Sequence, residues 1–203
     1  MGAPFTLGGT SDWRDVPARR PMVLLNSAYA GSGFGGFSGS PLAPGRPPNQ
    51  PDGSFALSVR PSRYYIVPVC FVGCYPASVL LGGQEALGQP VDLVSSSQSL
   101  QVVYKAAAGV LRGTVDAAST ILVIPEQITS LGFGRMERAK PDGSFEVTGI
   151  VPGTYAVAAL TGLPQAGRLE SDVLERVLST GERVSVQEGS PASVNLTAVP
   201  WLQ

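Results

Sequence analysis

The turn sequence Pro-Asp-Gly-Ser-Phe decides the fold because it occurs twice, in PDGSFALSVRPSRYY (51–65) and in PDGSFEVTGIVPGTY (141–155). In each copy Pro presets φ, Asp bonds the local backbone and Gly takes the positive φ of a tight turn. The residues after the turn alternate between apolar and polar, as in a strand with one buried face. A second turn and another apolar strand follow. Each stretch therefore predicts a strand, a turn and a strand, which we interpret as a hairpin packed on a hydrophobic core.

The polar residues of these turns are interpreted as structural. A calcium ion takes about six to eight oxygen ligands, whereas each turn offers one carboxylate beside a glycine. No cofactor or metal site is therefore predicted here. The residues assigned to the two kinds of turn are Asp52, Gly53, Asp142, Gly143, Pro152 and Gly153.

The similarity of the two halves extends beyond the turns. Upstream, Leu7–Thr10 matches Leu111–Thr114. The downstream segments Val91–Leu93 and Leu100–Val102 match Val184–Val186 and Val194–Leu196 in the same order. Four landmarks in one order predict two tandem copies of one β-domain, at residues 1–105 and 109–203, with the boundary at 104–110.

The repeat also pairs individual side chains. Phe55 and Phe145 are predicted to be buried equivalents, and so are Tyr64 and Tyr155. Roughly seven short strands per ~100 residues is the count of an immunoglobulin-like β-sandwich. Further expected strands are Met22–Ser27, Ala77–Leu81, Gln101–Tyr104, Ile121–Ile124, Arg183–Gln187 and Ala192–Ala198.

One segment of the second copy departs from the β pattern. Residues Leu169–Thr180 place apolar side chains at helical spacing, and Gly181 follows their end. We expect one short helix that covers an edge or end of the second sandwich. The fold class predicted is all-β, with two tandem immunoglobulin-like or transthyretin-like sandwiches.

The composition excludes several classes of function. The chain contains no histidine and only two lysines, so the commonest general base and the common nucleophile–base pairs are missing. A net charge of −1 gives no basic surface for nucleic acid. No apolar run is long enough for a transmembrane segment. We expect a protein that is not an enzyme.

The two cysteines, Cys70 and Cys74, lie in the apolar sequence VPVCFVGCYPAS (67–78). Gly73 suggests the tip of a hairpin, across which the two thiols reach disulfide distance. Either they form a disulfide, which favours an extracytoplasmic location, or both stay reduced. The start of the chain has no apolar signal segment, so a signal sequence is expected to have been removed or to lie upstream.

Apolar residues at unusual places suggest an interface. Phe34 and Phe37 lie in the Gly/Pro-rich loop at 30–50, which either folds back on its sheet or meets a neighbour. The apolar ends of the chain, with Phe5 at one and Trp201 and Leu202 at the other, either cover their own sandwiches or lie along another chain. These five residues are the candidate interface.

The motifs PDGSFEVTGIVPGTY (141–155) and TGERVSVQEGSPASVNLTAV (180–199) give the chain a family resemblance. It resembles bacterial carboxypeptidase-regulatory-like domains, which are transthyretin-like (prealbumin-like) sandwiches found in tandem in envelope and secreted proteins. The match covers most of 109–203. It is weaker in 1–105, where Ser62-Arg63 replaces the usual Gly after Pro61. The resemblance implies an extracytoplasmic accessory or structural role without catalysis.

Two functions follow from these observations. One is a structural or assembly module at the cell surface that associates with itself or with another envelope protein, for example through open sheet edges. The other is a carbohydrate-binding accessory module of a larger protein. Its candidate platform is a set of scattered aromatic residues: Trp13, Tyr29, Tyr64, Tyr65, Tyr75 and Trp201.

Overall fold

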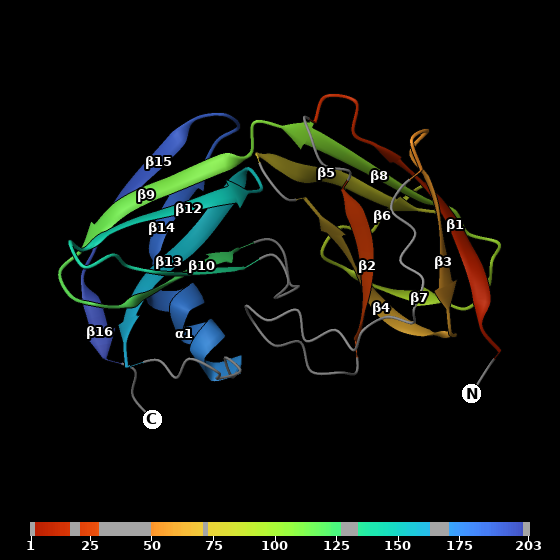
Figure 1. The fold of residues 1–203 in the computed structure, drawn as a ribbon. Helices are drawn as coiled ribbons and strands as arrows, with labels where there is room; N and C mark the ends of the chain where they lie inside the picture. The colour runs from red at the N-terminus through yellow and green to blue at the C-terminus, as the bar shows by residue number, and fades with distance from the viewer. Residues whose placement is uncertain are drawn as a thin grey trace. The chain divides into compact units, whose positions relative to one another are not determined.

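The computed structural model describes residues 3–16, 21–28, 50–70, 73–126, 134–162 and 171–200. Contacts divide the chain between Ala107 and Ala108 into two compact units. We call the part up to Ala107 unit 1 and the part from Ala108 unit 2 (Figure 1).

Unit 1 is a sandwich of two sheets. One sheet has the strand order β3-β1-β8-β5-β6, and the other has the order β2-β4-β7. Leu7 and Val79 of the first sheet pack in one core with Ile66 and Leu93 of the second, all almost fully buried. The strands of unit 1 are β1 (Phe5–Asp12), β2 (Met22–Ser27), β3 (Ser54–Val59), β4 (Ser62–Val69), β5 (Cys74–Leu81), β6 (Gln84–Glu85), β7 (Pro90–Leu93) and β8 (Leu100–Ala106).

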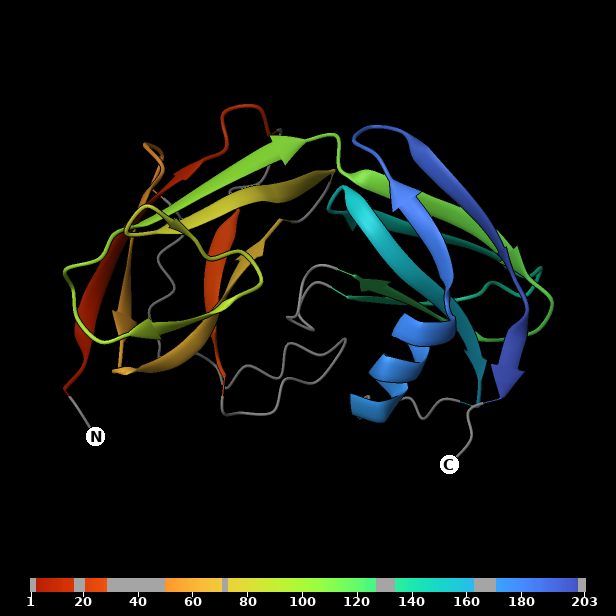
Figure 2. The ribbon, with the colours of Figure 1, turned by 180° about the vertical axis from the view of Figure 1, so that it is seen from behind.

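Unit 2 is built in the same way, from a sheet of order β12-β9-β15 and a sheet of order β11-β10-β13-β14 (Figure 2). Its core joins Leu111 and Phe145 of one sheet to Ile121 and Val157 of the other. The elements of unit 2 are β9 (Gly109–Val115), β10 (Thr120–Pro125), β11 (Arg135–Arg138), β12 (Ser144–Ile150), β13 (Gly153–Thr161), α1 (Ser171–Thr180), β14 (Glu182–Val186), β15 (Pro191–Leu196) and β16 (Ala198–Pro200).

The strand register repeats between the units. In unit 1, β1 and β8 run parallel with Gly9 opposite Leu100. In unit 2, β9 and β15 run parallel with Gly113 opposite Val194. The sequence repeat matches Gly9 with Gly113 and Leu100 with Val194, which are the residues of these two pairs. The repeat is therefore one of three-dimensional structure as well as of sequence.

The predicted hairpins are wrong. β3 pairs with β1 whereas β4 pairs with β2 and β7, so the turn at Pro61 joins two different sheets. The same holds in unit 2, where β12 pairs with β9 and β13 pairs with β10 and β14. The alternation of apolar residues is correct in both cases, but it reports only which face is buried. It does not say which strand supplies the hydrogen-bond partners.

The predicted short helix is confirmed as α1, which begins at Ser171 and ends at Thr180, but its predicted place is wrong, because it packs on two inner strands of a sheet and not at an edge or end of the sandwich. It packs on β13 and β10, where Val177 joins a second apolar cluster with Leu122, Ile124 and Ala156. β10 and β13 are therefore buried on both faces, which explains their unbroken apolar sequences. The all-β fold class is likewise confirmed. No helix in the described ranges is long and apolar enough to cross a membrane.

Candidate functional site

The two Pro-Asp-Gly-Ser turns have the same hydrogen bonds. In each, Oδ1 of the aspartate (Asp52 or Asp142) accepts from the following serine (Ser54 or Ser144), at 2.9 Å from the backbone N and 2.7 Å from Oγ. These hydrogen bonds hold the pKa of both carboxyls below its usual value. Within the described residues, no group of three or more acidic or cysteine side chains is placed to hold a metal ion. The hydrogen bonds from the serines fix the two turns where β3 and β12 begin.

The turn glycines fit against a neighbouring strand. Gly53 accepts a hydrogen bond from Ser11 N at 2.7 Å, and Gly143 accepts one from Val115 N at 2.9 Å. Both glycines have positive φ, near +80°, and a Cβ on either would lie within 2.4 Å of the carbonyl oxygen of the same neighbour. Glycine is required at both positions for the backbone conformation and for this close approach.

The second turn of each unit is fastened by a tyrosine. Tyr155 donates its hydroxyl to Val151 O at 2.5 Å, and Tyr64 donates to Arg60 O at 3.0 Å. This is the i to i−4 pattern of a tyrosine corner in a sandwich. Pro152 and Gly153 lie inside that loop, and Gly153 begins β13. Tyr155 is 2% exposed as predicted, whereas Tyr64 is only half-buried, so the predicted equal burial of the two tyrosines is wrong, and the feature that they share is the hydrogen bond.

Burial of Tyr155 makes unit 2 sensitive to alkali. Burial raises the pKa of its phenol from 10.0 to about 12, and the nearby Arg135 guanidinium partly opposes this. Because the folded state disfavours the phenolate, its contribution to stability is complete below about pH 10 and is lost as the pH rises toward 12. We expect the free energy of unfolding to fall over that interval, as measured by urea unfolding at stepped pH. Tyr155→Phe should reduce the slope; an unchanged slope would contradict this assignment.

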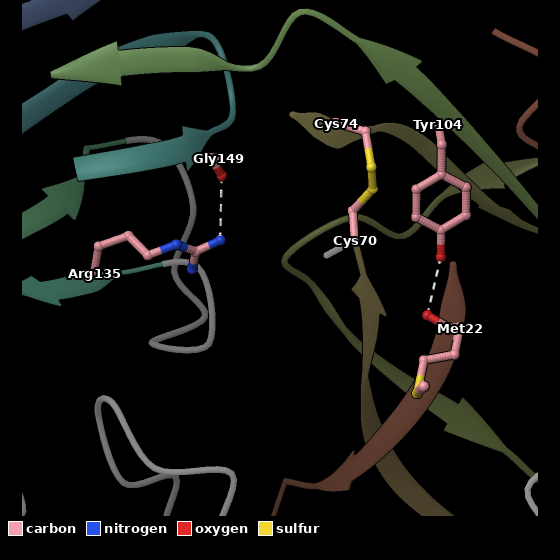
Figure 3. Close-up of a disulfide and its surroundings, with 6 residues drawn as sticks. All are labelled: Met22, Cys70, Cys74, Tyr104, Arg135 and Gly149. Atoms are coloured by element: carbon pink, nitrogen blue, oxygen red, sulfur yellow. Dashed lines mark hydrogen bonds between the residues drawn. A yellow bond between two sulfur atoms is a disulfide. The ribbon is translucent and has the colours of Figure 1, made fainter. Parts of the chain in front are cut away.

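The cysteines are joined by a disulfide, Cys70–Cys74, with a Cα–Cα distance of 5.8 Å (Figure 3). Cys70 follows β4 and Cys74 begins β5, so the bond lies where the chain passes from one sheet of unit 1 to the other. The predicted pairing is supported, but its predicted place at a hairpin tip is wrong. Tyr104, which is 2% exposed, forms a second link between the sheets by donating its hydroxyl to Met22 O at 3.0 Å (Figure 3).

A thiol count tests the disulfide directly. Protein unfolded in denaturant without reductant should show no thiol that reacts with a maleimide, because the two cysteines of the chain are bonded to each other. The same protein should show two reactive thiols after reduction. Two reactive thiols before reduction would exclude the bond.

The sequence did not single out Arg135, which lies on β11 and is partly buried. Its guanidinium donates to Gly134 O at 3.1 Å. It also donates to Gly149 O at 3.4 Å (Figure 3). Burial lowers its pKa. Because β11 and β12 belong to different sheets, Arg135 closes one side of the unit 2 sandwich. No motif marked it, since the exposed carbonyl at Gly149 arises from a bulge that appears only on pairing with β9.

The aromatic side chains in the described ranges are mostly used in packing. Tyr75 is buried, Tyr64 is bonded to its own turn, and Trp13 packs against the core of unit 1. Tyr65 is half-buried on β4, and Tyr29 and Trp201 lie outside the described residues.

The candidate interface residues fall into two groups. Phe5 begins β1 and packs against the core of its own unit. Phe34, Phe37, Trp201 and Leu202 lie outside the described residues. The chain just before Trp201 forms β16, which pairs with β13 of unit 2 and leaves Val199 half-exposed.

The sheet edges differ between the units. β3 is the outer strand of its sheet in the described part of the chain, and its sequence SFALSV has no charge and no proline. Its counterpart β12 carries Glu146, ion-paired with Arg112 at 2.6 Å, and a bulge at Gly149. Charges and bulges discourage a second chain from pairing with an edge, and β3 has neither. The β3 edge (Ser54–Val59) is therefore the candidate functional surface.

Comparison with known proteins gives a distant likeness only. No family model and no curated protein matches the chain. Among solved structures it is similar to a streptococcal ancillary pilin, with 12% identity, a TM-score of 0.35, and coverage of 96% of this chain and 62% of that one. It is also similar to a minor pilin of Streptococcus agalactiae (11%, TM-score 0.36, 98% of each chain). The major pilin of Bacillus cereus matches at 9% identity and a TM-score of 0.26, over 98% of this chain and 99% of that one. These values identify neither a family nor a function for the chain.

Proposed function

We propose that the chain is a non-enzymatic, extracytoplasmic structural subunit that assembles with other copies of itself through the β3 edge. The observation that carries this proposal is the contrast between β3 and β12. The two strands hold equivalent positions in their units, yet only β12 has a charged residue and a bulge. An uncharged outer strand accepts main-chain hydrogen bonds from an added strand.

The disulfide supports the proposed compartment. Disulfides persist in secreted and envelope proteins and are rare in a reducing cytosol. Unit 1, which holds this bond, also presents the β3 edge. The proposed membership in the carboxypeptidase-regulatory-like family is supported by the duplicated Pro-Asp-Gly-Ser turn and by the tyrosine that fastens the next turn.

The proposed partner of unit 1 is unit 2 of another copy. Residues 1–105 carry seven basic and five acidic residues, and residues 106–203 carry seven basic and ten acidic residues. The net charges are therefore +2 and −3. Opposite signs favour contact between unlike units, and such head-to-tail contacts extend into filaments when the rotation between copies does not close.

The test is particle size as a function of concentration. We expect the purified chain to form particles larger than one chain, measured by analytical ultracentrifugation and electron microscopy. Ser58→Lys places a charge on an exposed position of β3 and should reduce assembly without lowering the melting temperature. Thr148→Lys is the matched control, because Thr148 is exposed at the equivalent position of β12.

Three other outcomes would each contradict part of the proposal. A chain that stays monomeric at every accessible concentration would end the assembly function. If Ser58→Lys and Thr148→Lys reduce particle size equally, the β3 edge is not the contact surface. A monomer retarded on polysaccharide gels would favour the carbohydrate-binding alternative instead.

A further inference from the structure

We infer that each unit is built to resist tension applied along the chain, because its first strand forms a parallel pair with the last strand of the same sheet. This inference concerns mechanical strength within one chain. It does not depend on the proposed assembly, and it can hold for a monomer.

In unit 1 the first strand is β1 and the last is β8. They pair in parallel over four residues, from Gly9 opposite Leu100 to Asp12 opposite Val103. Both are inner strands, because β3 flanks β1 and β5 flanks β8. When the chain is pulled from its two ends, the force acts on unit 1 at the amino end of β1 and at the carboxyl end of β8.

In unit 2 the first strand is β9, and β15 is the last strand of the sheet that contains it. They pair in parallel over six residues, from Val110 opposite Pro191 to Val115 opposite Leu196. Beyond β15, β16 makes a further parallel contact of three residues with β13. The longer pairing predicts that unit 2 yields at a higher force than unit 1.

The direction of the load decides the strength. When two parallel strands are pulled from opposite ends, they slide along each other, and all of their hydrogen bonds share the load and must break together. When the same strands are pulled from the same end, the bonds carry the load one at a time and the pair opens like a zipper. Forced unfolding is governed by the barrier to unfolding, so the first geometry should raise the force while the equilibrium stability is unchanged.

The experiment pulls one protein in two directions by single-molecule force spectroscopy. One handle is at the carboxyl end in both arms. The other is a thiol-linked handle on Lys105→Cys, near the end of β8 and four residues before β9, or on Ala117→Cys, two residues after β9; both positions are exposed. The native cysteines are bonded to each other, so without reductant the handle attaches only to the introduced thiol. The β16 contact is common to both arms.

We expect the force that unfolds unit 2 to be several times higher when the handle is attached at position 105 than when it is attached at position 117. The released length in the Lys105 arm should be about 31 nm, from about 3.4 Å per residue over residues 109–200. Equal unfolding forces in the two arms would overturn the inference. If Ala117→Cys lowers the melting temperature, Ala118→Cys supplies the same geometry at another exposed position.

A second measurement pulls the whole chain through its ends. Two events are expected, with unit 1 yielding first. Reduction of Cys70–Cys74 should lengthen the earlier event by about 0.8 nm, because the four steps from residue 70 to residue 74 extend to about 1.4 nm and the intact bond already spans 5.8 Å between the two Cα atoms. If the later event lengthens instead, the predicted order of the units is wrong.

Discussion

Phe145→Ala is expected to destabilise unit 2 by about 3–5 kcal/mol, the usual range for truncating a core phenylalanine. Phe145 is 3% exposed, and its ring lies directly under Gly113 of β9. Gly113 has no side chain that could move into the space left by the ring. We therefore expect a cost in the upper part of this range, measured by denaturant unfolding.

Unit 1 supplies the comparison for this variant. Phe55 is 6% exposed and lies against Gly9 in the same way, so Phe55→Ala should destabilise unit 1 by a similar amount. Glu146→Ala removes an exposed neighbour of Phe145 together with a surface ion pair, and it should cost less than about 1 kcal/mol. A loss below about 1 kcal/mol for Phe145→Ala would mean that the ring is not part of the core.

Gly9→Ala is expected to destabilise unit 1 by about 1–3 kcal/mol through overpacking. A Cβ at Gly9 would lie 2.3 Å from Phe55 Cζ and 2.7 Å from Leu100 O. One contact is a ring held in the core and the other is the backbone of the parallel partner strand, so neither can move without breaking other contacts. Hydrogen exchange should show faster exchange across β1 and β8.

The adjacent glycine is the matched control. Gly8 also lies in β1, but a Cβ there meets no atom within 4 Å. Gly8→Ala should therefore leave stability unchanged or raise it by about 0.4–1 kcal/mol, since alanine restricts the unfolded chain more than glycine does. Equal losses of stability for Gly8→Ala and Gly9→Ala would show that the contacts of a Cβ with Phe55 and Leu100 are not the cause of the loss.

Part of the candidate site could be read from the sequence. The turns at Asp52 and Asp142 are local, since their side-chain hydrogen bonds reach only two residues along the chain, and their purely structural role stays a prediction. The disulfide was predicted for the same reason, since short spacing brings Cys70 and Cys74 together. The β3 edge could not be found in this way. Whether a strand is at an edge depends on the order of all strands in its sheet.

The sequence by itself determined the duplication and most of the strand positions, because these follow from local turn chemistry and from the alternation of apolar residues. Only the tertiary structure decided which strands pair. The two strands after each Pro-Asp-Gly turn join different sheets, and Tyr104 reaches Met22 across 82 positions of sequence. Backbone hydrogen bonds are chemically the same at every residue. The choice among partners is therefore made by the packing of the whole core, and with it the parallel pairing of β1 with β8 and of β9 with β15.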